Sequence, residues 1–434
     1  MIIDRLPSFL QGFFRPMKGR LSKPQFPHLW SLVLALAVDV RAAKLVHLSA
    51  AAPRRGHRTR KGAFLSTSDW DAPALLDQGA LALLARMKPR PGEVMYLILD
   101  DNRMAKRGRK MDWISKIYDH KGHRFTRGHI ALTAAVCFRG VMLPWRIELW
   151  KPRGHPGPRY RTLTHMAAAM IKAFGAPEGA NGMEGVKVRV LFDSFYLCPR
   201  VVRACESKGF TFFSVAARNR NFTPFTGAAK RAKRGRRRQI ARLMPGMVRH
   251  QGRDVRMKRA RGKVARLRIA CRDGHLSHVG PVRMVVSKRP RGPWKKCIAI
   301  VTNETGLKPR QIVEIYEKRW LIEVLFKELL QDLGLGDYQM LQKDGIVNHL
   351  HACCLAHLML TRHCLDSVEG LGEQAKTPRQ QVQMPPMSTR LRTLREQIAE
   401  EQIRRLVKGD AHARLRKKLL LHLLGRPPAG KAAA

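Results

Sequence analysis

The chain has 434 residues, with 83 Lys and Arg against 32 Asp and Glu, so its formal net charge is +51. A hydrophobic content of 44% excludes a wholly disordered chain, and this length suffices for two or three domains of roughly 150 residues each. No ordinary metabolic enzyme needs such an excess of cations, which attracts polyanions in a strongly salt-dependent way. Nucleic acid is therefore the expected partner, ahead of an acidic membrane surface.

The N-terminal region, residues 1–90, is predicted to be helical. Its longest apolar run, 29–38, has about half the length of a membrane-spanning helix and predicts a buried helix instead. Asp4 and Pro7 interrupt any signal-peptide pattern. The eight Cys include no CxxC pair, which favours a reduced, intracellular protein. A second helix is expected at Ala74–Met87, after a basic linker at Pro53–Ala63.

From Gly92 the pattern changes to short apolar runs that Gly and Pro interrupt, which is typical of strands. Strands are predicted at Met95–Leu99, His129–Phe138, Val141–Trp150, Val186–Phe192 and Phe210–Val215, and helices at Thr162–Phe174 and Leu197–Lys208. Arg139 and Gly140 predict a hairpin turn, and Pro144 requires an edge or a bulge. This order, three strands and then helix, strand, helix, strand, is that of the ribonuclease H-like fold. Two of the strands end at Asp, at Asp100 and Asp193.

The second half of the chain opens with a run of cations, Lys230–Arg238, typical of a solvated loop, a DNA-backbone contact or an import signal. Residues 246–302 are predicted to be β-rich, with strands at Lys263–Ala270, Val282–Ser287 and Lys296–Thr302. One long helix, Lys308–Leu333, is expected to end at Gly334 and Gly336. The remainder is predicted to be helical and basic, with a loose linker near 377–388 and a tail after Gly425.

The helix Lys308–Leu333 brings polar residues to one face. At about 100° per residue, Tyr316, Arg319, Lys327 and Leu330 share the face of Glu323. A separate apolar stripe consists of Ile315, Ile322, Phe326, Leu329 and Leu333. An amphipathic helix with ordinary ion pairs, such as Glu323 with Arg319 or Lys327, explains this pattern equally well.

Tyr316, Arg319 and Glu323, separated by two and three residues, resemble the Tyr-Arg-Glu-Lys signature of bacterial insertion-sequence transposases with an Asp-Asp-Glu triad. The surrounding text YEKRWLIEVLFKELLQDLGLGDYQ is similar to that family as well. The resemblance extends from residue 57 to about residue 360. The Lys of the signature, seven residues after the Glu, is replaced by Leu330, and Lys327 one turn earlier is an alternative phosphate contact.

The resemblance implies that Asp100, Asp193 and Glu323 are catalytic. Asp101 competes with Asp100, because strand parity does not decide between them, but the family pattern favours Asp100. Asn102 stands where the family has Thr. The alternatives are a turn aspartate at position 100 or 101 and a helix N-cap at Asp193. Tyr196, three residues after Asp193, also fits the family.

Three carboxylates suit two Mg²⁺ ions, for which Mn²⁺ can substitute, because such ions clamp the attacking and leaving oxygens of a phosphodiester. By the resemblance, water cleaves the DNA first and the freed 3′-hydroxyl attacks target DNA later. The partners implied are double-stranded DNA, namely terminal inverted repeats and target DNA, and further copies of the chain, with no membrane. The implied location is the cytoplasm, on the nucleoid.

Several residues are candidate DNA contacts. The resemblance places Tyr316 and Arg319 near the cleavage point, although Arg319 could instead pair with Glu323. The segment Arg218–Asn221 follows the last core strand, so Arg218, Asn219 and Arg220 could contact phosphates. Trp294, flanked by cations, could stack on an unpaired base, although packing is the commoner role.

The His- and Cys-rich segment 349–364 suggests zinc, but its apolar, helical pattern favours a packed helix. The expected architecture is an α/β (α+β) ribonuclease H-like mixed-sheet core with a β-rich insertion and helical ends. Its predicted parts are an end-recognition region (1–90), the first part of the core (91–220) and a basic linker with the β-rich insertion (221–305). The end of the core with the Glu helix (306–365) and a basic C-terminal region (366–434) follow.

Two other functions remain open at this stage. A catalytically decayed or domesticated transposase that only binds DNA agrees with Leu330 and Asn102. An RNA-binding protein agrees with the net charge alone.

Overall fold

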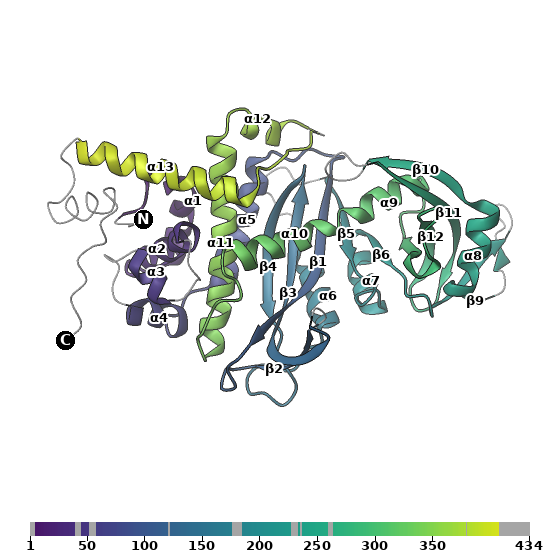
Figure 1. Cartoon of the computed structure of the whole chain (residues 1–434), viewed down its shortest axis with the longest axis horizontal. Coiled ribbons are helices and arrows are strands. Elements are labelled where there is room, and N and C mark those ends of the chain that lie inside the picture. The colour runs from purple at the N-terminus through teal and green to yellow at the C-terminus, as the bar shows by residue number, and fades with distance from the viewer. Residues whose placement is uncertain are drawn as a thin grey trace.

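A central mixed sheet organises the chain (Figure 1). The N-terminal helices and α13 lie beyond one side of the sheet, and a smaller β-rich part with α8 lies beyond the other. The computed structural model describes residues 5–39, 45–51, 58–119, 122–175, 185–226, 233–234, 237–258, 264–378 and 380–407. The predicted tail after Gly425 lies outside these residues.

The N-terminal region is helical, as predicted. Its helices are η1 (Ser8–Leu10), α1 (Gln11–Phe14), η2 (Arg15–Arg20), α2 (Gln25–Val38), α3 (Leu45–Ala51), α4 (Arg58–Ser66) and α5 (Ala72–Arg86). The run 29–38 is buried throughout in α2, and the Asp71 side chain caps α5 by accepting from the Ala74 amide at 2.9 Å. The prediction of a linker at Pro53–Ala63 is wrong from Arg58 onward, because α4 begins there. Residues 52–57 lie outside the described ones.

The first part of the sheet has the predicted ribonuclease H-like order. Its elements are β1 (Val94–Lys106), β2 (Ser115–Asp119), β3 (Arg124–Phe138), β4 (Val141–Leu149), α6 (Leu163–Ala173), β5 (Lys187–Phe192), α7 (Pro199–Glu206) and β6 (Thr211–Val215). Strand β1 pairs antiparallel with β3 and parallel with β5, and β5 pairs parallel with β6. The parallel pairing places the middle of β1, just after Ile98, beside the carboxyl end of β5.

Two features of this part differ from the prediction. Strand β1 does not end at Leu99 but continues to Lys106, because its second half pairs with β3 as far as Arg127. The short strand β2 was not predicted from the sequence. It pairs with the beginning of β3 and forms one end of the sheet.

The β3–β4 hairpin is confirmed. Arg139 and Gly140 both have positive φ, 47° and 86°, which is the two-residue turn that suits the twist of a hairpin. A Cβ on Gly140 would lie 2.7 Å from the Val382 carbonyl oxygen, so glycine is required twice over at this position. Pro144 lies on β4 where the register shifts at Ala134 and Ala135, so it occupies a bulge.

The predicted β-rich insertion continues the same sheet. Its elements are β7 (Asn221–Thr226), β8 (Lys233–Arg234), β9 (Arg238–Gln239), α8 (Ile240–Gln251), β10 (Arg253–Lys258), β11 (Val264–Leu276), β12 (Gly280–Lys288), η6 (Trp294–Lys296) and β13 (Ile298–Thr302). Strand β13 pairs antiparallel with β6, so the order across the sheet is β2-β3-β1-β5-β6-β13-β12-β11-β7-β8. The start of the β-rich stretch at 246 is wrong, since α8 occupies residues up to Gln251; most of the run Lys230–Arg238 lies outside the described residues.

The single long helix expected at Lys308–Leu333 is interrupted. It consists of α9 (Pro309–Glu317), α10 (Trp320–Lys327) and a π-helical turn η7 (Glu328–Asp332), before Gly334 ends it at a φ of 66° as predicted. The C-terminal helices α11 (Lys343–Ser367), α12 (Leu371–Lys376) and α13 (Met387–Val407) follow. Within the described part of the chain, no helix combines the length and apolar character needed to cross a membrane.

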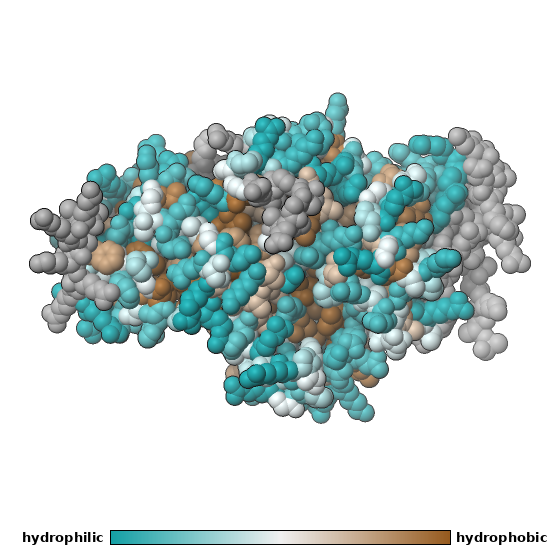
Figure 2. All heavy atoms as spheres, turned by 180° about the vertical axis from the view of Figure 1, so that it is seen from behind, coloured by the Kyte–Doolittle hydropathy of each residue, from teal (hydrophilic) through white to brown (hydrophobic). Residues whose placement is uncertain are grey.

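The face shown in Figure 2 is mostly hydrophilic, with hydrophobic side chains visible near its middle. This surface agrees with the excess of charged residues in the composition.

A buried arginine joins the sheet to the helices at both ends of the chain. Arg139 is 4% exposed and pairs with Glu93, with 3.0 Å between Nε and Oε1. Its Nη1 also donates to the carbonyls of Met87, at the end of α5, and of Ala375, in α12, at 2.7 and 2.6 Å. One side chain therefore fixes α5, the β3–β4 turn and α12 together.

Replacing Arg139 by Met should lower the free energy of unfolding by about 3–5 kcal/mol, because it removes the buried guanidinium that pairs with the buried Glu93 carboxylate. Urea unfolding followed by circular dichroism measures this change. The double variant Arg139→Met with Glu93→Leu should recover part of the loss. The control is Arg310→Met, which changes an exposed arginine that also forms an ion pair. If Arg139→Met lowers the free energy of unfolding no more than this control does, Arg139 does not stabilise the junction of α5, the β3–β4 turn and α12.

Candidate active site

Strands β1 and β5, helix α10 and the hairpin β2–β3 enclose a cleft of about 740 Å³. It contains all three predicted catalytic carboxylates, and its lining consists of Asp100, Asp101, Asn102, Arg103, Ala105, Ile117, Tyr118, Thr126, Asp193, Glu323, Phe326, Lys327, Leu330 and Gln331. Residues more than 200 positions apart in sequence thus meet in one place. The hairpin residues of this lining were not among the predicted site residues.

Asp100 lies within β1, opposite Thr133 of β3, so it is a strand residue and not a turn aspartate. Its side chain is 18% exposed, and Oδ2 accepts from Arg319 Nη1 at 2.8 Å. Burial raises the pKa of Asp100 to about 7, with a further upward contribution from Asp193 and Asp101 and a downward one from Arg319.

Asp101 faces a different partner. Its Oδ1 accepts from the Tyr196 hydroxyl at 2.8 Å, and its Oδ2 lies 3.7 Å from Arg103 Nε. Tyr196 is fully buried, so this bond ties β1 to the loop after β5. Both aspartates line the cleft, but only Asp100 contacts the helix that carries Glu323. The choice between them as metal ligand stays a prediction.

Asp193 follows the last residue of β5. Its Oδ1 accepts from the Phe195 amide at 2.9 Å, and Ser214 of β6 donates to its backbone carbonyl at 3.0 Å. It does not cap a helix, because α7 begins at Pro199 with Cys198 as its N-cap residue. Burial raises the pKa of Asp193, and repulsion from Asp101 adds to the effect.

Glu323 and Arg319 lie one turn apart at the start of α10. Arg319 Nη2 donates to Glu323 Oε1 at 2.7 Å, so one guanidinium bridges Asp100 and Glu323. The ion pair considered as an alternative is therefore present, and it extends to a second carboxylate. Tyr316 lies close enough to interact with Arg319 and Asp193, and burial raises its pKa to about 12.

The interruption between α9 and α10 lies within the helix face that carries Tyr316, Arg319 and Glu323. Around it, backbone bonds run from residue i to i−3, including Arg319 to Tyr316 at 3.0 Å and Ile322 to Arg319 at 3.2 Å. This tighter winding is the 3₁₀ pattern that often marks functional segments of helices. Neither Gly nor Pro accompanies it, so no sequence signal predicted it.

A buried network anchors the other end of α10. Glu328, in the π turn, accepts from Arg390 of α13 at 2.6 Å and contacts His357 of α11 at 2.9 Å. Burial alone would raise the pKa of Glu328, but His357 and Arg390 more than offset it, and the pKa is lowered. The helix that carries Glu323 is thus held by α11 and α13.

The other predicted DNA contacts have different surroundings. Lys327 is exposed and, like Leu330, lines the cleft. Arg218 donates to the carbonyls of Trp294 and Cys297, and Arg220 donates to that of Leu197. Asn219 is exposed. Trp294 is 46% exposed, with Lys288 Nζ 5.2 Å from its ring centroid, so it is not a core residue.

The His- and Cys-rich segment forms the middle of α11 and is almost entirely buried, as the packed-helix interpretation predicts. His349 bonds to the Gly334 carbonyl at 3.0 Å, and burial lowers its pKa to about 4. His351 bonds to the Val347 carbonyl in its own helix at 2.8 Å.

The carboxylates of the cleft suit a hard cation. They are oxygen donors, which Mg²⁺ prefers. Burial, with a smaller contribution from repulsion between the aspartates, raises the pKa values of Asp100 and Asp193, so a bound cation would favour their charged forms. As the described side chains lie, no three His, Cys, Asp or Glu groups come close enough to hold an ion. Arg319 stands between Asp100 and Glu323 in this arrangement.

The raised pKa of Asp100 predicts a pH dependence of stability. The folded-state pKa of Asp100, about 7, exceeds its ordinary value of 3.8. Between these two pH values the folded protein binds a proton that the unfolded chain does not, so the free energy of unfolding falls as the pH rises from 3.8 to about 7. The variant Asp100→Asn should lack this pH-dependent loss of stability. At pH 8 its free energy of unfolding should exceed that of the parent by about 1–3 kcal/mol. Urea unfolding in EDTA at pH 5 and pH 8 measures it.

The matched control is Asp254→Asn, which changes an exposed aspartate of β10 and should follow the parent at both pH values. An Asp100→Asn variant with the same loss of stability between pH 5 and pH 8 as the parent would refute the assignment.

The chain is similar to known proteins in two comparisons. The family model described as the transposase DDE domain matches residues 96–359. The probable transposase for insertion sequence element IS701 of Microchaete diplosiphon is 33% identical over 111 residues, which are 25% of this chain and 28% of that protein. The chain therefore aligns with little more than a quarter of this curated relative's length.

Proposed function

The chain belongs to the DDE-domain transposases of bacterial insertion sequences, and from this premise we propose that it cleaves DNA at the ends of its element and joins them to target DNA. The observation that carries the proposal is the convergence of Asp100, Asp193 and Glu323 on one cleft. These residues come from two strands and a helix that lie far apart in the sequence.

Asp100, Asp193 and Glu323 would together hold two Mg²⁺ ions, with Mn²⁺ as a substitute. When bound, such a pair stabilises the attacking and leaving oxygens of an in-line displacement. Buried, mutually repelling carboxylates support this assignment, because each gains from a nearby cation. Asp101, held by Tyr196, would keep β1 in position beside β5.

The chain's own cations would orient the DNA. Arg319 reaches the carboxylates and offers a planar fork of donors to a phosphate near the cleavage point, and Tyr316 adjoins it. Lys327 would contact the backbone from the rim of the cleft. On the insertion side, the exposed Asn219 and Trp294 are the better placed of the proposed contacts.

Arg218 and Arg220 support the loop between β6 and β7 through backbone carbonyls, so we propose for them a weaker, indirect part in DNA binding. The remaining assignments stay proposals of the same kind: residues 1–90 for recognition of the terminal repeats, 221–305 as an insertion in the core, 366–434 as a basic C-terminal region, and an assembly of several copies on DNA.

Nicking of a DNA fragment that contains the gene's own flanks tests the proposed activity. The parent should cut at symmetric flanking positions with Mg²⁺ or Mn²⁺ and not with EDTA. Glu323→Gln and Asp193→Asn should lower the rate by at least about a hundredfold, since each removes a proposed metal ligand. Asp193→Asn should bind DNA as tightly as the parent or more tightly, because it loses a negative charge that faces phosphate.

Asp254→Asn serves as a charge-matched control outside the cleft and should cut normally. An Asp193→Asn variant that cuts like the parent would exclude the proposed triad. Binding of the flanks without cuts under any metal would favour the second candidate, a decayed or domesticated transposase that only binds DNA.

Leu330 is the observation that favours this second candidate. It lines the cleft beside Lys327 at the position where the family's signature has Lys. Leu330→Lys should tighten DNA binding severalfold and steepen the slope of log Kd against log salt by about 1, the effect of one more phosphate contact. Fluorescence anisotropy at several salt concentrations measures both, with Leu330→Met as control. An unchanged slope would show that position 330 does not face the DNA.

A further inference from the structure

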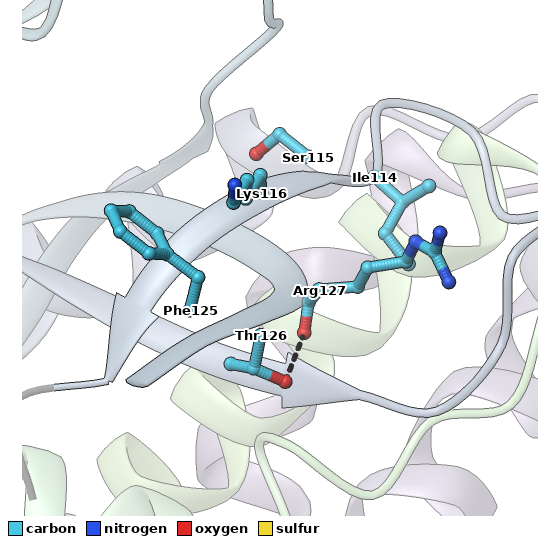
Figure 3. Close-up of a pocket in the computed structure, with 6 residues that line it drawn as sticks. All are labelled: Ile114, Ser115, Lys116, Phe125, Thr126 and Arg127. Carbon is cyan, nitrogen blue, oxygen red and sulfur yellow. Dashed lines mark hydrogen bonds between the residues drawn. The ribbon is translucent and has the colours of Figure 1, made fainter. Parts of the chain in front are cut away.

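The hairpin formed by β2 and the beginning of β3 lies at one end of the sheet and forms a wall of the catalytic cleft. Its residues Ile117, Tyr118 and Thr126 line the cleft, and it projects below the rest of the sheet in Figure 1. A second hollow of about 500 Å³ lies on the hairpin, and Thr126 lines both spaces, so the hollow adjoins the cleft. The lining of the hollow consists of Ile114, Ser115, Lys116, Phe125, Thr126 and Arg127 (Figure 3).

Two cations of the hairpin oppose each other across neighbouring strands. Lys116 of β2 pairs with Arg127 of β3, and Arg127 pairs on its other side with Lys106 of β1. Like charges directly opposite one another destabilise a sheet. Lys106 donates to two backbone carbonyls, whereas Lys116 and Arg127 are exposed and form no ion pair among the described side chains. An anion bound at Lys116 and Arg127 would remove this repulsion.

An aromatic ring is held in place beside these cations. Phe125 is 63% exposed, and its cross-strand partner Tyr118 meets it edge to face, with 5.2 Å between the ring centroids. Lys116 Nζ lies 4.6 Å from the centroid of the Phe125 ring. Two contacts therefore orient the ring while most of it stays open to solvent. Such a ring suits stacking, because little ordering is left to occur on binding.

The combination of ring and cations favours a nucleic-acid strand over a protein partner. An apolar protein surface would cover Phe125 but leave Lys116 and Arg127 without counter-charges. A second copy of this chain would bring a further excess of cations. A fully paired duplex offers phosphates but no open base face, because its bases stack on one another. A strand with unpaired bases offers both, and aromatic rings in a positively charged groove are the usual platform for such strands.

We propose that the β2–β3 hairpin binds unpaired bases of DNA beside the cleft, with Phe125 stacking on a base and with Lys116 and Arg127 contacting adjoining phosphates. In Figure 3 the Arg127 side chain extends away from Phe125, so the base and the phosphate would lie on either side of Thr126. The inference rests on the proposed function, since it takes DNA as the substrate of the cleft. Stacking and backbone contacts tolerate any base, so the hairpin would recognise the unpaired state and not the sequence.

Binding of DNA in EDTA tests the proposal without cleavage. Three probes share one length and one sequence: a fully paired duplex, the same duplex with a short mismatched segment at its centre, and a duplex with abasic sites in that segment. Fluorescence anisotropy measures the Kd of each. The parent should bind the mismatched probe about tenfold more tightly than the paired and abasic probes, since only the mismatched probe offers open base faces.

The ring and the unpaired bases should act as one contact. Phe125→Ala should lose most of the tenfold gain and bind the paired and abasic probes like the parent, because removal of the ring and removal of the bases abolish the same interaction. Phe125→Trp keeps an aromatic ring and should retain the gain. Its retention would exclude a general disturbance of the hairpin as the cause of the loss. Ile403→Ala, which changes an exposed apolar side chain of α13, is the matched control and should retain the gain.

The cations should contribute to the salt dependence. The double variant Lys116→Ala, Arg127→Ala should weaken binding of the mismatched probe and lower the slope of log Kd against log salt by about 2, for two phosphate contacts. The matched control is Lys172→Ala with Arg203→Ala, which removes exposed cations of α6 and α7 that line neither space. This control should bind the mismatched probe with the gain of the parent.

The other results overturn the inference in distinct ways. Equal weakening of all three probes by Phe125→Ala would show that the ring contacts paired DNA and does not stack on a base. Unchanged binding of all three by Phe125→Ala and by the double variant would exclude the hairpin as a contact. A parent that binds the three probes equally would overturn the preference for unpaired bases alone. A parent that binds no DNA probe would overturn the proposed function itself.

Discussion

The parallel pairing of β1 with β5 is the constraint on which the site depends. It brings the Asp100–Asp101 pair and Asp193 to one edge of the sheet, in surroundings that raise the pKa values of Asp100 and Asp193. Negative charges so close together repel one another, and Arg319 relieves part of this repulsion by contacting Asp100 and Glu323. The guanidinium thus holds α10 against the sheet.

The periphery of the molecule supports this centre through two further buried arginines. Arg139 links the sheet to α5 and α12, and Arg390 links the turn after α10 to α13. In both cases a buried arginine pairs with a glutamate, which is buried at Glu93 and partly buried at Glu328. Each arginine also donates to backbone carbonyls, which satisfies most of its donors. The helical ends of the chain therefore support the site structurally.

Local patterns predicted much of this arrangement. Short-range periodicity and turn chemistry, which can be read from the local sequence, determine four of its features. These are the order of strands and helices, the Arg139–Gly140 turn, the end of the helix at Gly334 and the buried stripe of α10. The grouping of Asp100, Asp193 and Glu323 came from the family resemblance. The features that were missed depend on contacts distant in sequence. Asp100, Asp101 and Asn102 are poor strand formers, yet pairing with β3 keeps them extended. Two further features, the β2–β3 hairpin that lines the cleft and the tighter 3₁₀ winding near Arg319, likewise have no signature in the local sequence.

The hydrogen bonds between β6 and β13 have a mechanical consequence. Because they make the insertion an extension of the core sheet, the insertion cannot rotate independently without breaking the pairs of Val215, Ser214 and Phe213. A DNA duplex that contacts the insertion and the cleft together must then conform to a rigid surface. Bending a duplex to a fixed shape costs on the order of 1–6 kcal/mol and depends on the flexibility of its base steps. The sheet would thus discriminate among DNA sequences by stiffness, at positions that no side chain touches.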